Sequence, residues 1–145
     1  MEVENEKVFN FTKKANMLFW AGIVGIGLSI TYLWASIGFG DNPPPVSLTL
    51  PYVFYFVFNS ALLILSGIFL QKKKKIGLIT FLLSVVSILI SFFIKIDNTN
   101  LFFHTIGMAL LGTLLVFPPI GTIFFFYSII NNLFDFKKWK NTIIK

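Results

Sequence analysis

The sequence predicts an all-α fold, an integral membrane four-helix bundle whose N- and C-termini both lie on the inner side of the membrane (N-in/C-in). Three observations predict this class: the composition, the lengths of the apolar segments and the positions of the lysines. Hydrophobic residues make up 56% of the 145 positions and charged residues only 12%, whereas soluble domains carry about 25% charged residues. A chain of this length cannot hide so much apolar surface from water. We therefore expect one small domain in a bilayer.

The first apolar segment predicts a retained transmembrane helix over residues 17–39. It contains no charged residue and exceeds the roughly 20 residues that cross a bilayer. A signal peptide is the competing interpretation, but its apolar core would be only about 7–15 residues long and would lead to a small-residue cleavage site. Residues 1–16 are expected to form a cytoplasmic tail.

A proline-rich segment separates the first span from the second. Three successive prolines begin at Pro43 and cannot continue a helix, so we expect a short loop over residues 40–51 with polyproline character. The second span is predicted over residues 52–70 and the third over residues 76–94. Between them lies QKKKKIG, and four adjacent cations are too costly to bury in hydrocarbon. This segment is therefore predicted to be the turn of a helical hairpin.

The fourth apolar segment follows a polar hairpin at residues 95–100 and is too long for one upright helix. The 34 residues from Leu101 to Phe134 would reach about 51 Å as a helix, against a hydrocarbon core of about 30 Å. Two crossings would place the C-terminal lysines opposite the QKKKKIG turn, against the positive-inside rule. We therefore expect one crossing over about residues 101–130, formed by a fourth helix that is kinked at Pro118-Pro119. The alternative is a re-entrant pair of short helices.

Lysines are distributed unequally between the two faces of this bundle. Together with the N-terminal tail, residues 1–16, the transmembrane domain, residues 17–134, and the basic tail, residues 135–145, place eleven of the twelve lysines on one face and Lys95 alone on the other. Such an excess marks the cytoplasmic face, so we expect a multi-pass protein of the cytoplasmic (inner) membrane. Aromatic belts put Trp20 at the inner interface and Trp34 near the outer one. The residues expected to contact anionic lipid headgroups or a partner's acidic groups are Lys72, Lys73, Lys74, Lys75, Lys137, Lys138, Lys140 and Trp139.

The predicted spans lack the side chains on which most intramembrane chemistry depends. Residues 17–39, 52–70, 76–94 and 105–134 contain no Asp, Glu, Lys, Arg or His, the residues from which proton relays and ion sites are built. His104 is the only histidine and has no second strong ligand for a metal or haem. The chain has no Cys and no catalytic motif. We therefore expect that the protein is not an enzyme and has no catalytic, cofactor or metal site. The absence of Arg argues against nucleic-acid binding despite the net charge of +6.

Small and polar residues within the spans predict helix-packing faces. Small residues let two helix backbones approach closely, and residues at i, i+3 and i+7 share one face of a helix. Packing within the bundle is one interpretation of these faces, and docking of another membrane subunit on the first strip is the other. The predicted faces consist of Ala21, Gly22, Gly25 and Ser29 on the first span, Asn59 on the second, and Ser84, Ser87 and Ser91 on the third.

Two segments are loosely similar to the first two helices of subunit III of haem–copper oxidases. These are LFWAGIVGIGLSITYLWASIG and LTLPYVFYFVFNSALLILSGIFL, the second of which precedes a basic loop. The similarity covers less than half of the chain. The membrane carboxylate that the family carries in a later helix has no counterpart here, and three further helices are missing. The resemblance implies an accessory subunit, and we do not assign the chain to that family.

We therefore expect a small non-catalytic membrane protein that acts as an accessory or assembly subunit of a larger complex. Its helix faces would contact another integral membrane protein or a second copy of the chain, and its lysine-rich rim would contact anionic lipid. One alternative is an immunity-type protein that blocks a membrane-active peptide or toxin. Another is an oligomeric pathway for an uncharged solute, lined by Asn59 and the serines of the third span.

Overall fold

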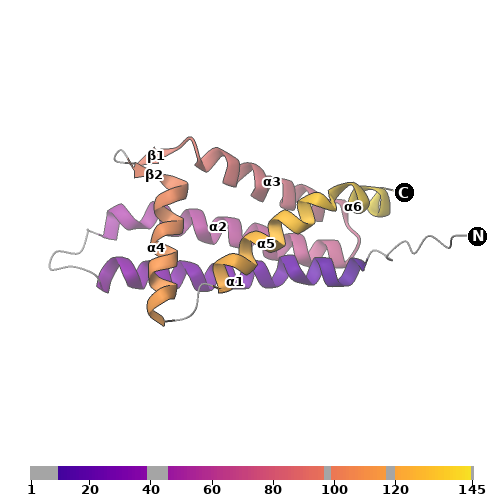
Figure 1. Cartoon of the computed structure of the whole chain (residues 1–145). Helices are drawn as coiled ribbons and strands as arrows, with labels where there is room; N and C mark the ends of the chain where they lie inside the picture. Colours follow the sequence, from indigo (N-terminus) through magenta and orange to yellow (C-terminus); the bar gives the residue numbers. More distant parts are fainter. Residues whose placement is uncertain (1–9, 39–45, 97–98, 117–119, 145) are drawn as a thin grey trace, which may run out of the picture.

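The computed structural model describes residues 10–38, 46–96, 99–116 and 120–144. This part of the chain is helical apart from one two-stranded hairpin (Figure 1). The elements are α1 Phe11–Gly38, α2 Val46–Gln71, α3 Lys75–Ser91, β1 Lys95–Ile96, β2 Thr99–Asn100, α4 Leu101–Val116, α5 Ile120–Phe134 and α6 Phe136–Ile143. The prediction of an all-α fold is confirmed.

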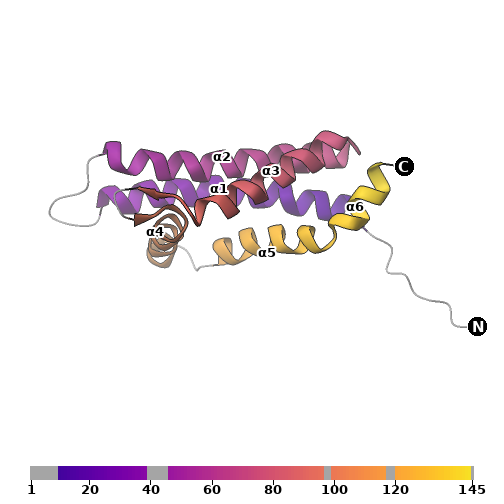
Figure 2. The same cartoon turned by 90° about the horizontal axis from the view of Figure 1, so that it is seen from above.

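The helices α1 and α2 form the long axis of the molecule, side by side and antiparallel (Figures 1 and 2). Two stretches within them, Phe11–Trp34 and Thr49–Gln71, are long and apolar enough to cross a membrane. Helix α3 packs mainly against α2, and α5 lies along the N-terminal half of α1. Helix α4 crosses the α1–α2 pair at a steep angle, since Figure 1 shows it from the side and Figure 2 end-on.

Glycines bring the backbones of α1 and α2 into direct contact. A Cβ atom built on Gly22 would lie 2.6 Å from the carbonyl oxygen of Ser60, and one built on Gly67 would lie 2.7 Å from the backbone nitrogen of Phe19. Both distances are shorter than Cβ atoms tolerate. Helices α1 and α2 therefore approach closely at two positions, Gly22 and Gly67, where a side chain would not fit. Small residues commonly allow such close contact between apolar helices.

Helix α1 begins earlier than its apolar segment suggests. The backbone N–H of Lys13 donates to the side-chain oxygen of Asn10 over 3.0 Å, which is the geometry of an N-cap. The helix therefore includes residues 11–16 of the predicted N-terminal tail. Residues 1–9 lie outside the described part of the chain.

Helix α2 also begins earlier than expected. Residues 46–51 were predicted to belong to a proline-rich loop, and they are helical, with Pro51 inside the helix. A proline removes one backbone hydrogen bond, and the packed remainder of a 26-residue helix tolerates that loss near its start. Pro43 and the two prolines after it lie outside the described residues.

The two predicted turns are confirmed. The QKKKKIG segment joins α2 to α3, and Lys73 adopts the left-handed conformation there with a φ of 52°. The polar segment after α3 forms a β-hairpin in which Lys95 pairs with Asn100. The side-chain oxygen of Asn100 accepts hydrogen bonds from the backbone N–H groups of Phe102 and Phe103, so this residue caps α4.

The fourth apolar segment is not one kinked helix. It is divided into α4 and α5, which run in clearly different directions (Figures 1 and 2). Helix α4 ends at Val116 and α5 begins at Ile120, and the predicted kink at Pro118-Pro119 lies outside the described residues. A proline disfavours helical conformation in the residue before it, so two in succession end a helix more readily than they bend it.

Candidate functional site

One end of the molecule gathers the start of α1, the turn between α2 and α3, and α6 (Figure 1). We call it the basic end. Of the ten lysines in the described ranges it carries nine, and Lys95 lies at the opposite end beside the β-hairpin. The predicted contact residues Lys72 to Lys75 and Lys137, Lys138 and Lys140 are all exposed. In this fold these exposed lysines lie together at the basic end.

Trp139 does not lie on that exposed surface. It was predicted to contact lipid or a partner, and this is wrong, because its side chain is 0% exposed. Its ring packs on Phe11 with centroids 4.5 Å apart, and its indole Nε1–H donates to the side-chain oxygen of Asn132 over 3.1 Å. Helix α6 turns its aromatic side inward and its lysines outward, so the tryptophan attaches α6 to α1 and α5.

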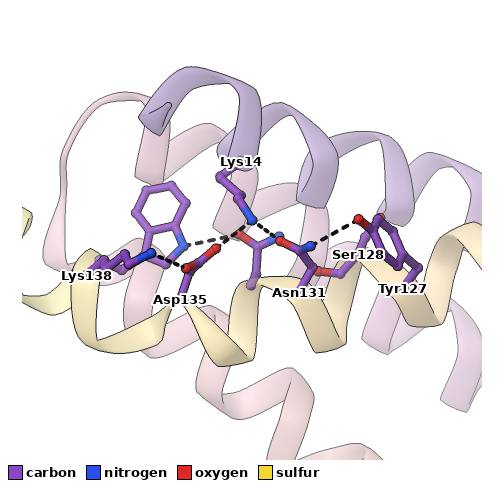
Figure 3. Close-up of polar contacts among 8 residues, drawn as sticks. Lys14, Tyr127, Ser128, Asn131, Asp135 and Lys138 are labelled. Carbon is purple, nitrogen blue, oxygen red and sulfur yellow. Dashed lines mark hydrogen bonds and ion pairs between the residues drawn. The ribbon is translucent and has the colours of Figure 1, made fainter. Parts of the chain in front are cut away.

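A cluster of charges joins α1 to the junction of α5 and α6 (Figure 3). The Nζ atom of Lys14 lies 2.5 Å from one oxygen of Asp135, and that of Lys138 lies 3.1 Å from the other. Lys14 also donates to the side-chain oxygen of Asn131, whose amide nitrogen donates to the hydroxyl of Tyr127 over 3.2 Å. Asp135 is the one carboxylate in the described ranges, and both of its oxygens are paired with cations.

The pKa of the Asp135 carboxyl is lowered, chiefly because Lys14 donates a hydrogen bond to it, while partial burial opposes the shift and Lys138 adds to it. A carboxyl whose folded pKa is below its unfolded value stabilises the fold above the unfolded pKa, about 4. That contribution is lost as the pH falls through the lowered folded pKa. Attachment of α6 should therefore weaken only under strongly acidic conditions.

Trp139 offers a readout of this pH dependence. In a Trp20→Phe, Trp34→Phe background, we expect its fluorescence to shift to longer wavelengths as the pH falls below the unfolded carboxyl pKa of about 4 and Asp135 is protonated. The Asp135→Asn variant should show part of the shift already at neutral pH and no further change in that range. An acid shift of the same size in Asp135→Asn would contradict this role of the carboxylate.

The predicted small-residue strip of α1 packs inside the chain. Ala21, Gly22, Gly25 and Ser29 are all buried, and a Cβ atom on Gly25 would collide with Ser60 and Phe125. In this fold the strip therefore packs against other helices of the same chain. The alternative, a docking face for another subunit, does not fit this fold because α2 and α5 already cover the strip.

The polar residues of α2 and α3 bond to one another. The hydroxyl of Ser84 faces the side-chain oxygen of Asn59 at 3.5 Å, and the hydroxyl of Tyr55 donates to that of Ser91 over 2.8 Å. Asn59, Ser84 and Ser91 are buried, and Ser87 is half-buried. Asn59 and Ser84 lie in the packed interface of α2 and α3, whereas Ser87 and Ser91 also line a groove between these helices.

A second group, whose members the sequence analysis did not bring together, lies near the end opposite the lysines. Tyr32, Tyr52 and His104 come from α1, α2 and α4, with the Tyr52 and His104 rings 4.5 Å apart. Tyr32 is fully buried, and its hydroxyl has no hydrogen-bond partner among the described residues. Only the helix crossing brings the three together, so no sequence spacing could have revealed them.

The described residues form grooves but contain no cluster of metal ligands. No group of three or more His, Cys, Asp or Glu side chains comes together within them. A groove of about 270 Å³ lies between α2 and α3 and is lined by residues that include Phe58, Val86 and Ile90. A wider one of about 530 Å³ lies at the basic end beside α1.

Comparison of the chain with models of protein families, with curated proteins and with solved structures finds no match. The resemblance to subunit III of haem–copper oxidases gains no support from these comparisons.

Proposed function

We propose that the chain is a small, non-catalytic integral membrane protein that serves as an accessory or assembly subunit of a larger membrane complex. The observation that carries this proposal is the surface of its helices. Large apolar side chains are exposed along α1, α2, α3 and α5, while the buried polar side chains of α2 and α3 bond within the bundle. Exposed apolar surface on this scale suits lipid or another membrane protein and not water.

The distribution of lysines supports an orientation with both termini in the cytoplasm. The basic end contains the start of α1 and the whole of α6, and the opposite end contains Lys95. Positive charge accumulates on the cytoplasmic side of membrane proteins. In this orientation α1, α2 and α3 cross the inner membrane, and α5 returns the chain to the inner side. The exposed lysines then contact anionic headgroups, and each contact contributes about 1 kcal/mol of membrane-binding free energy.

The outward face of α3 is the surface that best fits a partner subunit. Helix α3 packs mainly on α2, so its other side carries uncovered aliphatic residues. Ile79, Leu83, Val86 and Ile90 are each roughly half exposed, and the last three also line the groove between α2 and α3. The small-residue strip on α1 is covered by α2 and α5 of the same chain, so we assign the partner contact to α3 in place of α1.

Site-specific photocrosslinking in native membranes tests this assignment. A diazirine analogue of leucine at position 83, on the outward face of α3, should crosslink to one membrane protein that also co-purifies in stoichiometric amount. The matched control is position 78 on the same helix, because Leu78 is only 5% exposed, and it should crosslink within the chain alone. Lipid adducts alone at position 83, with the protein recovered without a partner, would contradict the accessory role.

A further inference from the structure

The groove at the basic end combines a polar rim with an apolar floor. Lys13 and the amides of Asn10 and Asn16 contribute polar lining, and Trp20 on α1 and Phe124 on α5 contribute apolar lining. Trp20 lies about 10 Å further along the α1 axis than Lys13, since a helix rises about 1.5 Å per residue. The groove therefore changes from polar to apolar in the direction that leads from the basic end toward the middle of the molecule.

The polar rim offers hydrogen-bond donors. The side-chain oxygen of Asn10 already accepts the backbone N–H of Lys13, and that of Asn16 accepts a hydrogen bond from Gln71 over 2.5 Å. The remaining polar groups of the lining residues are two amide NH₂ groups, the ammonium of Lys13 and the hydroxyl of Thr12, each of which can donate a hydrogen bond. A phosphate oxygen accepts from donors of this kind, and ionised acceptors form the stronger bonds.

Charge at the rim is not neutralised inside the described part of the chain. Asp135 is the one carboxylate there, and Lys14 and Lys138 occupy it. Lys13 has no ion-pair partner among the described residues and is exposed. Its charge is therefore available to a ligand, whereas the charge of the adjacent Lys14 is not.

We propose that this groove binds one anionic phospholipid, whose phosphate contacts Lys13, Asn10 and Asn16 and whose acyl chain lies along Trp20 and Phe124. This inference rests on the proposed membrane location. It goes beyond general attraction of the lysine-rich rim to anionic lipid, because it assigns one site with donors and a hydrocarbon floor. Tryptophan side chains favour the headgroup level, and Trp20, which is 56% exposed, lies where headgroup and chain meet.

Quenching of Trp20 fluorescence by brominated lipids tests the site. The protein, in a Trp34→Phe background, is reconstituted into phosphatidylcholine vesicles that contain increasing fractions of chain-brominated phosphatidylglycerol or chain-brominated phosphatidylcholine. Trp139 is buried and contributes little to the change. Brominated phosphatidylglycerol should quench at a lower mole fraction than brominated phosphatidylcholine.

Two charge-neutralising variants separate the groove from the rim. Lys13→Gln should weaken the preference for phosphatidylglycerol about fivefold, the equivalent of about 1 kcal/mol per lysine, and Lys13→Arg should keep it. Lys137→Gln removes the same charge from exposed α6, outside the groove, and should weaken the preference reported by Trp20 clearly less than Lys13→Gln does. Equal quenching by the two lipids, or an equal loss of the phosphatidylglycerol preference in both Gln variants, would overturn the proposed lipid site in the groove but not the membrane location. No quenching by either lipid would overturn both.

Discussion

Replacement of Gly22 by leucine is expected to separate α1 from α2. Even the first side-chain carbon would lie 2.6 Å from the carbonyl oxygen of Ser60 and 2.9 Å from the backbone nitrogen of Ile64. Backbone atoms cannot rotate away as a side-chain end can, so the helices must move apart along their length. Overpacked interiors lose about 1–3 kcal/mol, and we expect Gly22→Leu to reach at least the upper part of that range. The midpoint of thermal unfolding in mild detergent measures the loss.

Gly27 provides the matched control on the same helix. A Cβ atom there meets nothing within 4 Å, so Gly27→Leu adds the same hydrocarbon without a collision. Its free energy of unfolding should stay within about 0.5 kcal/mol of that of the parent, the usual range for surface substitutions. The midpoint of thermal unfolding should therefore change little. Equal midpoints for Gly22→Leu and Gly27→Leu would mean that α1 and α2 do not touch at Gly22.

Truncation of Trp139 is expected to release α6. The side chain is fully buried, and removal of such an aromatic side chain costs about 3–5 kcal/mol. Trp139→Phe keeps most of the packing on Phe11 but leaves the side-chain oxygen of Asn132 without its donor, which costs about 1–3 kcal/mol. Trp139→Ala should therefore have the larger effect.

Cleavage by trypsin reports the state of α6, because its lysines are exposed while its backbone is helical. Cleavage after Lys137, Lys138 and Lys140 should be slow in the parent, faster in Trp139→Phe and fastest in Trp139→Ala. Lys14→Ala, which removes one side of the Asp135 cluster, should fall between the parent and Trp139→Ala. A parent rate in Trp139→Ala would show that the tryptophan does not hold α6.

The sequence was sufficient to predict the features that depend on local chemistry. Four adjacent lysines after an apolar run specify a turn, and the structure has that turn between α2 and α3. Small residues at Gly22 and Gly25 predict close helix contact, and glycine is required there. Serines spaced along α3 predict a buried face, and Ser84 and Ser91 are fully buried.

The features that were missed depend on what a surface packs against. An amphipathic pattern in α6 predicts one apolar side but does not say whether lipid or protein covers it, so Trp139 was placed in the interface when it is buried against Phe11. Likewise, Pro118-Pro119 marks a change of direction without fixing its angle, so α4 and α5 were predicted as one helix. The strip on α1 predicted contact without identifying α2 as the partner.

The candidate site divides in the same way. The exposed lysines could be predicted because charge in this number must remain in water or at headgroups. The pairing of Lys14 with Asp135 joins residues far apart in sequence, and the convergence of Tyr32, Tyr52 and His104 depends on three helices. Such long-range contacts leave no periodic signal in the chain.

The accessibility of two single cysteines tests the central claim, a membrane-embedded α2–α3 hairpin, most directly. The chain has no cysteine of its own, so an introduced thiol is the sole target of a membrane-impermeant maleimide. Lys95→Cys, at the β-hairpin, should be labelled in intact cells, and Lys74→Cys, in the turn between α2 and α3, only after the membrane is permeabilised. Labelling of Lys74→Cys but not of Lys95→Cys in intact cells would mean that the orientation is the reverse of the proposed one. Equal labelling of both variants, whether in intact cells or only after permeabilisation, would contradict a hairpin that spans the membrane.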